Sequence, residues 1–196
     1  EVLETFYIGL LKSVLGVRKS TSNAAVYKEL GVYPLKCFME FQTIKYWCNF
    51  TRGRQFKPSC RVYELLTKKT GRPDNWALKL KKLMRELGFE NVFNNPNDFA
   101  QQWDVLLVEM KNRVKMKYEQ LIIDEITENK KLDIYKRIVS PIFKIEDYLI
   151  FIGSPRHRCA LTLLRTSSHS LEIEKGRWAK PKVERLDCLC PDCLVL

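Results

Sequence analysis

Apolar side chains recur at intervals of three or four residues along nearly the whole chain, and this spacing limits the possible folds more than any other feature. Residues three or four positions apart lie on the same face of an α-helix, so the repeat marks the buried face of each helix. The alternation of apolar and polar residues that is typical of strands is almost absent. The sequence therefore predicts an all-α protein, an irregular multi-helix bundle.

Capping residues predict the helix boundaries in the first part of the chain. A helix over 3–15 ends at Gly16. A short helix follows and ends at Gly31, because glycine tolerates the left-handed conformation that closes a helix. Pro34 fits the first turn of a third, long helix. The short helix can be capped by any of three adjacent side chains, those of Thr21, Ser22 and Asn23.

The same signals predict further helices downstream. Pro73 and Asp74 start the second of them, and Asp98 caps the third. These helices are expected over residues 59–70, 73–87, 99–128, 132–138, 142–151 and 155–166.

Two arrangements of the helices fit this pattern. One has a helical lobe over 1–95 and another over 96–180, with the turn-rich NNPN stretch as the seam. The other is a single continuous bundle. In both, residues 181–196 are expected to form a loose tail.

The charge of the chain is strongly positive and unevenly distributed. The net charge is +11 and the pI is near 9.3, which is typical of proteins that face phosphate, an acidic protein or an anionic membrane. Lys and Arg interrupt every apolar run, so no membrane-spanning helix and no membrane partner are expected. Residues 52–85 hold eleven basic and two acidic side chains, which is the pattern of a binding surface.

The basic stretch is our first candidate site for nucleic acid. Cations on helices and loops bind phosphates with loose geometry, and Phe56, Tyr63 and Trp76 lie among them, where they could stack on bases. The alternative is a solvated basic face above aromatic residues of the core. The candidate phosphate-binding residues are Arg52, Arg54, Lys57, Arg61, Lys68, Lys69, Arg72, Lys79, Lys82 and Arg85.

The second candidate is the segment from Ser154 to Trp178. Two arginines stand at the start of a helix, where the helix dipole disfavours cations unless an anion is near. Hydroxyl, imidazole, guanidinium and indole groups follow, which suits recognition of a nucleic-acid backbone or, alternatively, a buried polar turn. The candidate residues are Arg156, Arg158, Arg165, His169, Arg177 and Trp178.

The cysteines near the C-terminus are the candidate metal ligands. Cys190 and Cys193 form a C-x2-C pair, and Cys188 precedes them. A structural zinc site needs four ligands, usually from two such pairs, so this set is incomplete and no cofactor is expected in this chain. Catalytic signatures are absent: the chain has no phosphate-binding glycine loop, no G-x-S-x-G and no H-E-x-x-H. It is therefore not expected to be an enzyme.

Two stretches resemble a known family. LLKSVLGVRKSTSNAAVYKELGVYPLKCFMEFQTIKYW, residues 10–47, is similar to the region downstream of the polymerase domain in non-LTR (LINE-type) retrotransposon reverse transcriptases. PRHRCALTLLRTSSHSLEIEKGRWAKP, residues 155–181, resembles that family's R-x-S-x-H-x-L-x-I-E-x-G-R-[WY] segment. In that segment the positions of the family's pattern are occupied by Arg165, Ser167 or Ser168, His169, Leu171, Ile173, Glu174, Gly176, Arg177 and Trp178.

The resemblance implies a function and partners. The chain would hold template RNA or target DNA near the upstream polymerase domain of the same polyprotein, inside a retroelement ribonucleoprotein of nucleus and cytoplasm. The polymerase and endonuclease domains would precede Glu1. A zinc-binding segment follows in the family; Arg185, Leu186 and the cysteines match its first half, with Asp187 inserted, so zinc is expected only on an extended chain.

A second interpretation has a different class of function. The chain could be a decayed or domesticated retroelement fragment that acts as a protein-interaction or packing module. Salt distinguishes the two, because phosphate binding weakens steeply with salt and hydrophobic docking does not.

Overall fold

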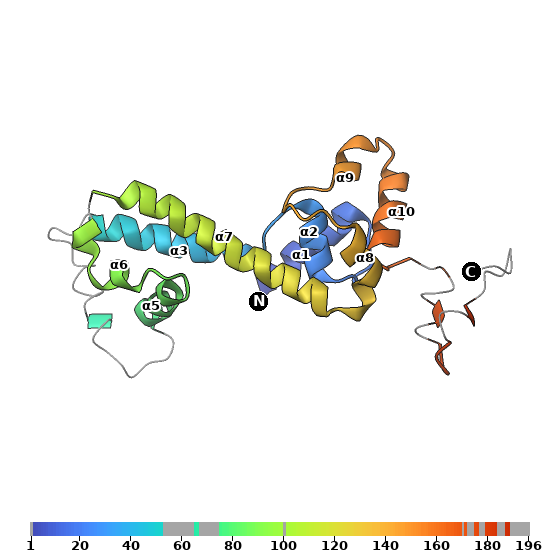
Figure 1. Cartoon of the computed structure of the whole chain (residues 1–196), viewed down its shortest axis with the longest axis horizontal. Coiled ribbons are helices and arrows are strands. Elements are labelled where there is room, and N and C mark those ends of the chain that lie inside the picture. The colour runs from blue at the N-terminus through green and yellow to red at the C-terminus, as the bar shows by residue number, and fades with distance from the viewer. Residues whose placement is uncertain are drawn as a thin grey trace. The chain divides into compact units, whose positions relative to one another are not determined.

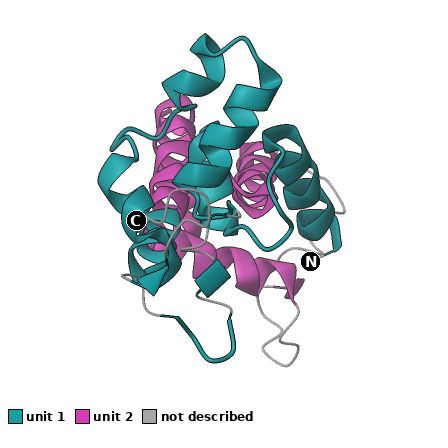
Figure 2. Cartoon of the chain, turned by 90° about the vertical axis from the view of Figure 1, so that its right-hand side faces the viewer, with its two compact units in different colours: residues 1–32, 120–196 teal, residues 33–119 magenta. Residues whose placement is uncertain are grey.

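The computed structural model describes residues 2–52, 65–66, 75–99, 101–169, 171, 175–176, 179–183 and 187–188. Within these ranges every regular element is a helix and no strand is formed, so the all-α prediction is confirmed. None of the described helices is long and apolar enough to cross a membrane. The chain divides into two compact units, which Figure 2 shows in different colours.

Unit 1 contains residues 1–32 and 120–196. Its core forms around α2, where Ala24, Ala25 and Val26 are fully buried and pack with apolar residues of the other helices. Figure 1 shows these helices gathered in one body. The elements are α1 (Val2–Leu15), α2 (Asn23–Leu30), the end of α7 (Trp103–Glu128), the 3-10 helix η2 (Lys130–Leu132), α8 (Asp133–Ile138), α9 (Asp147–Phe151) and α10 (Pro155–Arg165).

The predicted ends of α1 and α2 are confirmed. Gly16 follows α1 with φ of 67°. Ser22 caps α2, where its side chain accepts from Ala25 N at 3.5 Å. Gly31 ends α2 in the left-handed conformation, with φ of 61°. A Cβ at Gly31 would collide with the backbone of Lys144 and Ile145, so glycine is required here for space as well as for conformation.

The helix predicted over 142–151 is much shorter in the structure, where α9 covers only Asp147–Phe151. Two backbone groups of the residues before it bond to α2. Lys28 Nζ donates to Ile142 O at 2.6 Å, and Glu146 N donates to Glu29 O at 2.9 Å. These tertiary hydrogen bonds satisfy backbone groups that a longer helix would have paired internally.

Unit 2 contains residues 33–119. Its core is built around Trp47, which is fully buried, stacks on Phe93 at 5.3 Å between ring centroids and meets Trp103 edge-on at 5.7 Å. The elements are α3 (Leu35–Arg52), α5 (Trp76–Glu86), α6 (Glu90–Asn94), the 3-10 helix η1 (Pro96–Phe99) and the first part of α7.

Two helix starts in unit 2 differ from the predicted ones. Asn75 caps α5, since its side chain accepts from Ala77 N at 2.9 Å; Pro73 and Asp74 lie outside the described residues. Asp98 does not cap α7. It lies in η1, and α7 begins at Trp103, because the turn residues before it close a 3-10 helix of their own in which Asp98 N donates to Asn95 O. Of the helix predicted over 59–70, only residues 65–66 are described, and both are helical.

The boundaries of the two units differ from those of the predicted lobes, which cover residues 1–95 and 96–180. The second boundary falls within α7, between residues 119 and 120. Met110, Val114 and Tyr118 belong to the unit 2 core, whereas Ile122 and Ile126 belong to the unit 1 core. One helix thus supplies both cores, which its uniform apolar spacing does not reveal.

Candidate nucleic-acid interface

Helix α5 presents lysines on one side and core residues on the other. Leu80, Leu83 and Met84 are buried in the unit 2 core. Their positions on the helix turn Lys79 and Lys82 outward, and both are exposed. These two lysines are the described part of the basic stretch that best fits phosphate contact.

The two described arginines of the stretch form ion pairs at the surface. Arg85 binds Glu90 through two nitrogens, with Nη2 at 2.8 Å from Oε1, and this hydrogen bonding lowers the pKa of the Glu90 carboxyl. Arg52 Nη2 lies 2.7 Å from Asp104 Oδ1. Because exposed ion pairs are weak, a phosphate can compete for these arginines. The other six candidates of the stretch lie outside the described residues: Arg54, Lys57, Arg61, Lys68, Lys69 and Arg72.

An aromatic cluster lies between α3 and α5. Tyr46 meets Trp76 edge-on at 5.9 Å between ring centroids and is nearly parallel to Phe50 at 6.4 Å. The sequence interpretation included Trp76 but missed Tyr46, because the helical repeat there was assigned to core packing. The signal that was available is the position of Tyr46 beside Lys45, on the side of α3 away from Ile44, Trp47 and Cys48. The other two candidate stacking residues, Phe56 and Tyr63, lie outside the described residues.

Arg165 belongs to a buried network in unit 1. Its Nε lies 2.8 Å from Glu29 Oε1, and its Nη2 lies 2.8 Å from Glu146 Oε2. The guanidinium also lies over the ring of Tyr148, at 5.0 Å from the centroid. Tyr148 OH donates to Glu29 Oε2 at 2.6 Å and shares a second hydrogen bond of 2.6 Å with Thr162 Oγ1. The Arg165 side chain is 12% exposed, which leaves it little surface for phosphate.

The network sets the protonation of its members. Burial raises the pKa of Glu29, and hydrogen bonds from Tyr148 and Arg165 lower it. The effect of burial is the larger, so the pKa is raised. Burial, together with the hydrogen bond to Glu29, raises the pKa of Tyr148. Arg165 is held cationic, because its hydrogen bonds to carboxylates raise the pKa of the guanidinium against the effect of burial.

The turn after α10 is buried as well. Thr166, Ser167 and Ser168 are all at most 3% exposed, and Ser168 Oγ forms a 2.8 Å hydrogen bond with Thr21 Oγ1. His169 Nδ1 accepts from Leu171 N at 3.3 Å. Of the two interpretations of this segment, the geometry of the described residues favours a buried polar turn. Arg177 and Trp178 lie outside the described residues.

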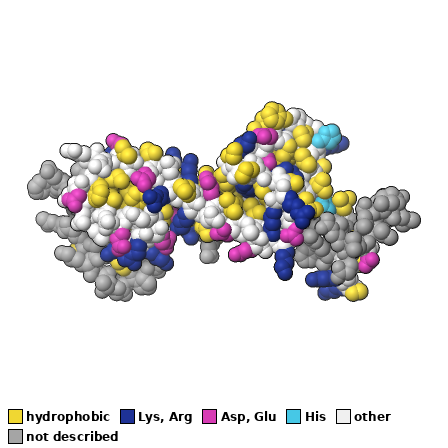
Figure 3. Space-filling model, viewed as in Figure 1, with side chains coloured by type: hydrophobic (Ala, Val, Ile, Leu, Met, Phe, Trp, Pro, Cys, Tyr) yellow, Lys and Arg dark blue, Asp and Glu magenta, His cyan; other side chains and the backbone are white. Residues whose placement is uncertain are grey.

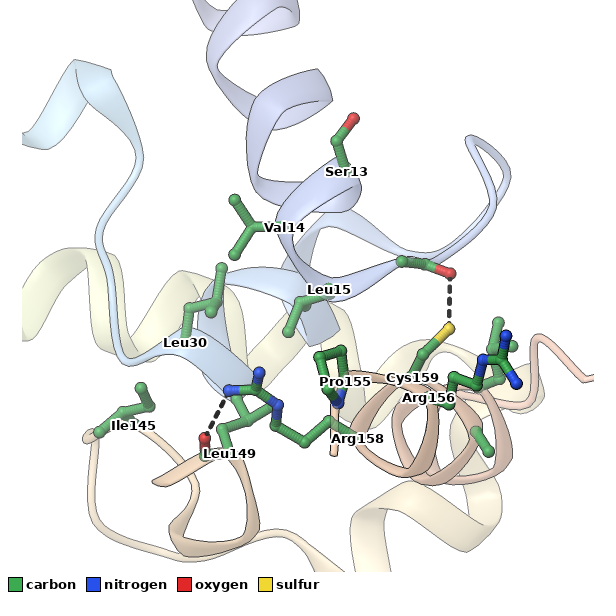
Figure 4. Close-up of a pocket in the computed structure, with 13 residues that line it drawn as sticks. Ser13, Val14, Leu15, Leu30, Ile145, Leu149, Pro155, Arg156, Arg158 and Cys159 are labelled. Atoms are coloured by element: carbon green, nitrogen blue, oxygen red, sulfur yellow. Dashed lines mark hydrogen bonds between the residues drawn. The ribbon is translucent and has the colours of Figure 1, made fainter. Parts of the chain in front are cut away.

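Arg156 and Arg158 line a cavity of about 680 Å³ in unit 1. Figure 4 shows them with Cys159 on one side and apolar side chains of α1 and α2 on the other. Arg158 Nη1 donates to Leu149 O at 3.3 Å, and Cys159 Sγ lies 3.2 Å from Gly16 O. The second contact places the start of α10 against the basic turn after α1. The apolar lining residues are Val14, Leu15, Leu30, Ile145, Leu149, Pro155, Ala160 and Leu163.

No metal centre forms among the described residues, where no three His, Cys, Asp or Glu side chains are grouped suitably for an ion. Cys188 is buried, with Sγ 4.0 Å from Val183 O. Cys190 and Cys193 lie outside the described residues, as do Arg185 and Leu186. The prediction of an incomplete zinc site therefore stays a prediction.

Comparison with known proteins does not assign the chain to a family. No family model matches it, and neither the curated proteins nor the solved structures gave a match. The function is therefore argued from the residues and their geometry.

Proposed function

We propose that this chain is the nucleic-acid-binding accessory region of a non-LTR (LINE-type) retroelement reverse transcriptase. It would hold template RNA or target DNA near the upstream polymerase domain of the polyprotein, within a ribonucleoprotein, and carry out no catalysis itself. The observation that carries the proposal is α5, whose buried face fixes the helix in unit 2 and whose Lys79 and Lys82 are exposed in the most basic part of the chain.

The proposed retroelement origin rests on the sequence resemblance. The two stretches that carry the resemblance are more than a hundred residues apart in sequence, yet they pack together. Glu29 of the first binds Arg165 of the second, and Thr21 of the first binds Ser168 of the second. Each of these residues falls within the quoted stretches.

The testing experiment compares two variants of equal charge. Lys79→Glu/Lys82→Glu changes the α5 face, and Lys130→Glu/Arg137→Glu changes two exposed residues of unit 1. We expect the wild-type chain to bind RNA and DNA oligonucleotides with little sequence preference. The α5 variant should bind all of them more weakly, and the salt slope of its log affinity should fall by about 0.7 to 0.9 per lost contact.

The control variant should lose much less affinity. Fluorescence anisotropy titrations at several salt concentrations measure both quantities. Equal losses in the two variants would remove α5 from the interface, and no binding by the wild-type chain would contradict the proposed function as a whole.

A second candidate function, a protein-interaction module, is favoured by the apolar surface of unit 1. Helix α1 exposes Leu3, Phe6, Leu10 and Val14, which lie three or four residues apart on one side. Val14 also lines the cavity. Figure 3 shows further hydrophobic side chains over α9 and α10. A partner held by this surface would bind with little dependence on salt, in contrast to nucleic acid.

A further inference from the structure

Tyr46 is an aromatic residue on the outside of unit 2. Its side chain is 62% exposed, whereas the next residue, Trp47, is fully buried. The turn of α3 explains the difference, since Ile44, Trp47 and Cys48 face the core and position 46 falls outside that face. An exposed ring of this size at a fixed helical position is available to a ligand.

The ring of Tyr46 is supported by its neighbours. Trp76 meets it edge-on at 5.9 Å, and Phe50 lies nearly parallel at 6.4 Å. Phe50 and Trp76 are partly buried and pack against the unit 2 core. Their packing limits the rotation of the ring, so a ligand that stacks on Tyr46 loses little further side-chain entropy on binding.

The surface around the ring is polar and cationic. Gln42 and Asn49 are exposed one turn before and one turn after Tyr46, and Lys45 is exposed beside it. Lys79 follows Trp76 by one turn on α5 and is exposed too. The acid of α3, Glu40, has a side chain that is only 17% exposed and lies 3.3 Å from Lys117 Nζ. The surface thus combines a ring, amides that can bond to base edges, and cations.

We propose that this surface binds single-stranded nucleic acid, with a base stacked on Tyr46 beside Trp76 and the adjoining phosphates on Lys45 and Lys79. The inference rests on the proposed function and deepens it by naming the form of the ligand. In a duplex the faces of the bases are covered by their neighbours, so only an unpaired base can stack on the ring. Every base has such a face, so the site has little sequence preference.

The test uses the full chain and three twelve-nucleotide ligands. These are an oligouridylate, an abasic strand with the same number of phosphates and a blunt duplex. Anisotropy titrations compare wild type with Tyr46→Ala. We expect the affinity of the variant for the oligouridylate to be lower than that of wild type by a factor of roughly ten or more, because stacking of one base on an aromatic side chain contributes this much. Affinity for the abasic strand and the duplex, and the salt slope, should not change.

Three further variants separate stacking from other effects. Tyr46→Phe keeps the ring and should retain wild-type affinity. Phe38→Ala removes a ring of similar exposure, 59%, two turns earlier on α3 and outside the cluster, and should also bind normally. Lys45→Ala should weaken binding to the abasic strand and to the oligouridylate alike, with a salt slope smaller by about 0.7.

The possible outcomes are distinct. If Tyr46→Ala binds the oligouridylate as tightly as wild type does, the inference is overturned, and the exposed surface is left to a protein partner. The proposed function would still be supported in that case if binding by the wild-type chain weakens with salt. The inference is also overturned if Tyr46→Ala loses as much affinity for the abasic strand as for the oligouridylate, or if Phe38→Ala loses as much affinity for the oligouridylate as Tyr46→Ala does. If the wild-type chain binds none of the three ligands, the proposed function itself fails.

Discussion

Arg165 and Glu29 form an ion pair across 136 positions of sequence, with Nε 2.8 Å from Oε1. The Glu29 side chain is fully buried, and Glu146, which binds the other end of the guanidinium, has a side chain that is 8% exposed. Two carboxylates therefore share one cation in the interior of unit 1. The pair connects the end of α2 with the end of α10, so the stability of unit 1 should depend on it.

Arg165→Ala should destabilise unit 1 by roughly 3–5 kcal/mol, because it leaves two buried carboxylates without their cation. Arg137→Ala is the matched control; Arg137 is exposed on α8, and its removal should change stability by about 0.5 kcal/mol or less. Amide hydrogen exchange with peptide resolution measures the effect, which should be confined to α2, α10 and the other elements of unit 1. Equal exchange in the two variants would show that the pair contributes little.

The stability of the chain should depend on pH through Glu29. Burial raises the pKa of this carboxyl above its usual 4.5 in the folded state, so the folded state holds the proton more tightly than the unfolded state. Its contribution to stability is complete below pH 4.5 and is lost as the pH rises through the folded pKa. The free energy of unfolding of wild type, minus that of Glu29→Gln, should therefore fall as the pH is raised from 4.5. Urea denaturation of both proteins at several pH values measures this difference, and a flat or rising difference would contradict the assignment.

Gly31→Ala should destabilise unit 1 by about 2–4 kcal/mol. The residue has φ of 61°, which costs a residue with a Cβ about 1–2 kcal/mol, and the added methyl would displace the backbone at Lys144 and Ile145. Gly153→Ala is the control, because a Cβ there meets nothing within 4 Å. Thermal unfolding followed by circular dichroism should give a lower Tm for the first variant only.

The buried thiols of unit 2 should resist alkylation. Burial raises the pKa of Cys37 to about 11 and that of Cys48 to about 12, and the reactive species is the thiolate. Cys159 of unit 1 is partly exposed. Limited treatment with iodoacetamide, followed by peptide mass mapping, should label Cys159 well before Cys37 and Cys48. Unfolding in urea should remove the difference; labelling of Cys48 in the native protein at the rate of Cys159 would show that unit 2 opens readily.

The sequence predicted the helical class and several helix ends because these depend on nearby residues. The Ser22 cap bonds to an amide three residues away, and Gly31 adopts a conformation that glycine itself permits. Asp98 was assigned wrongly as the cap of α7 by the same logic, since a local signal does not show that the preceding turn forms a separate 3-10 helix. The helical repeat alone predicted that Lys79 and Lys82 share one face of α5.

The sequence pattern did not predict contacts between residues that lie far apart in the sequence. Arg165 was predicted to meet phosphate, whereas the structure surrounds it with Glu29 and Glu146, and nothing in the spacing of these three residues indicates that they meet. The position of Tyr46 on α3 indicates that it points away from the core, but its contacts with Phe50 and Trp76 join residues of two helices and are visible only in the fold.

The sequence by itself therefore determined that the chain is helical, where α1 and α2 end and where its positive charge is concentrated. These properties arise from the spacing of apolar residues, from backbone conformation and from charge, all of which act over one or two helical turns. Tertiary structure alone decided that α7 supplies both cores, that Glu29 binds Arg165 and that α9 begins as late as Asp147. Those outcomes depend on which distant groups can satisfy one another once water is excluded, and such pairing is a property of the folded chain.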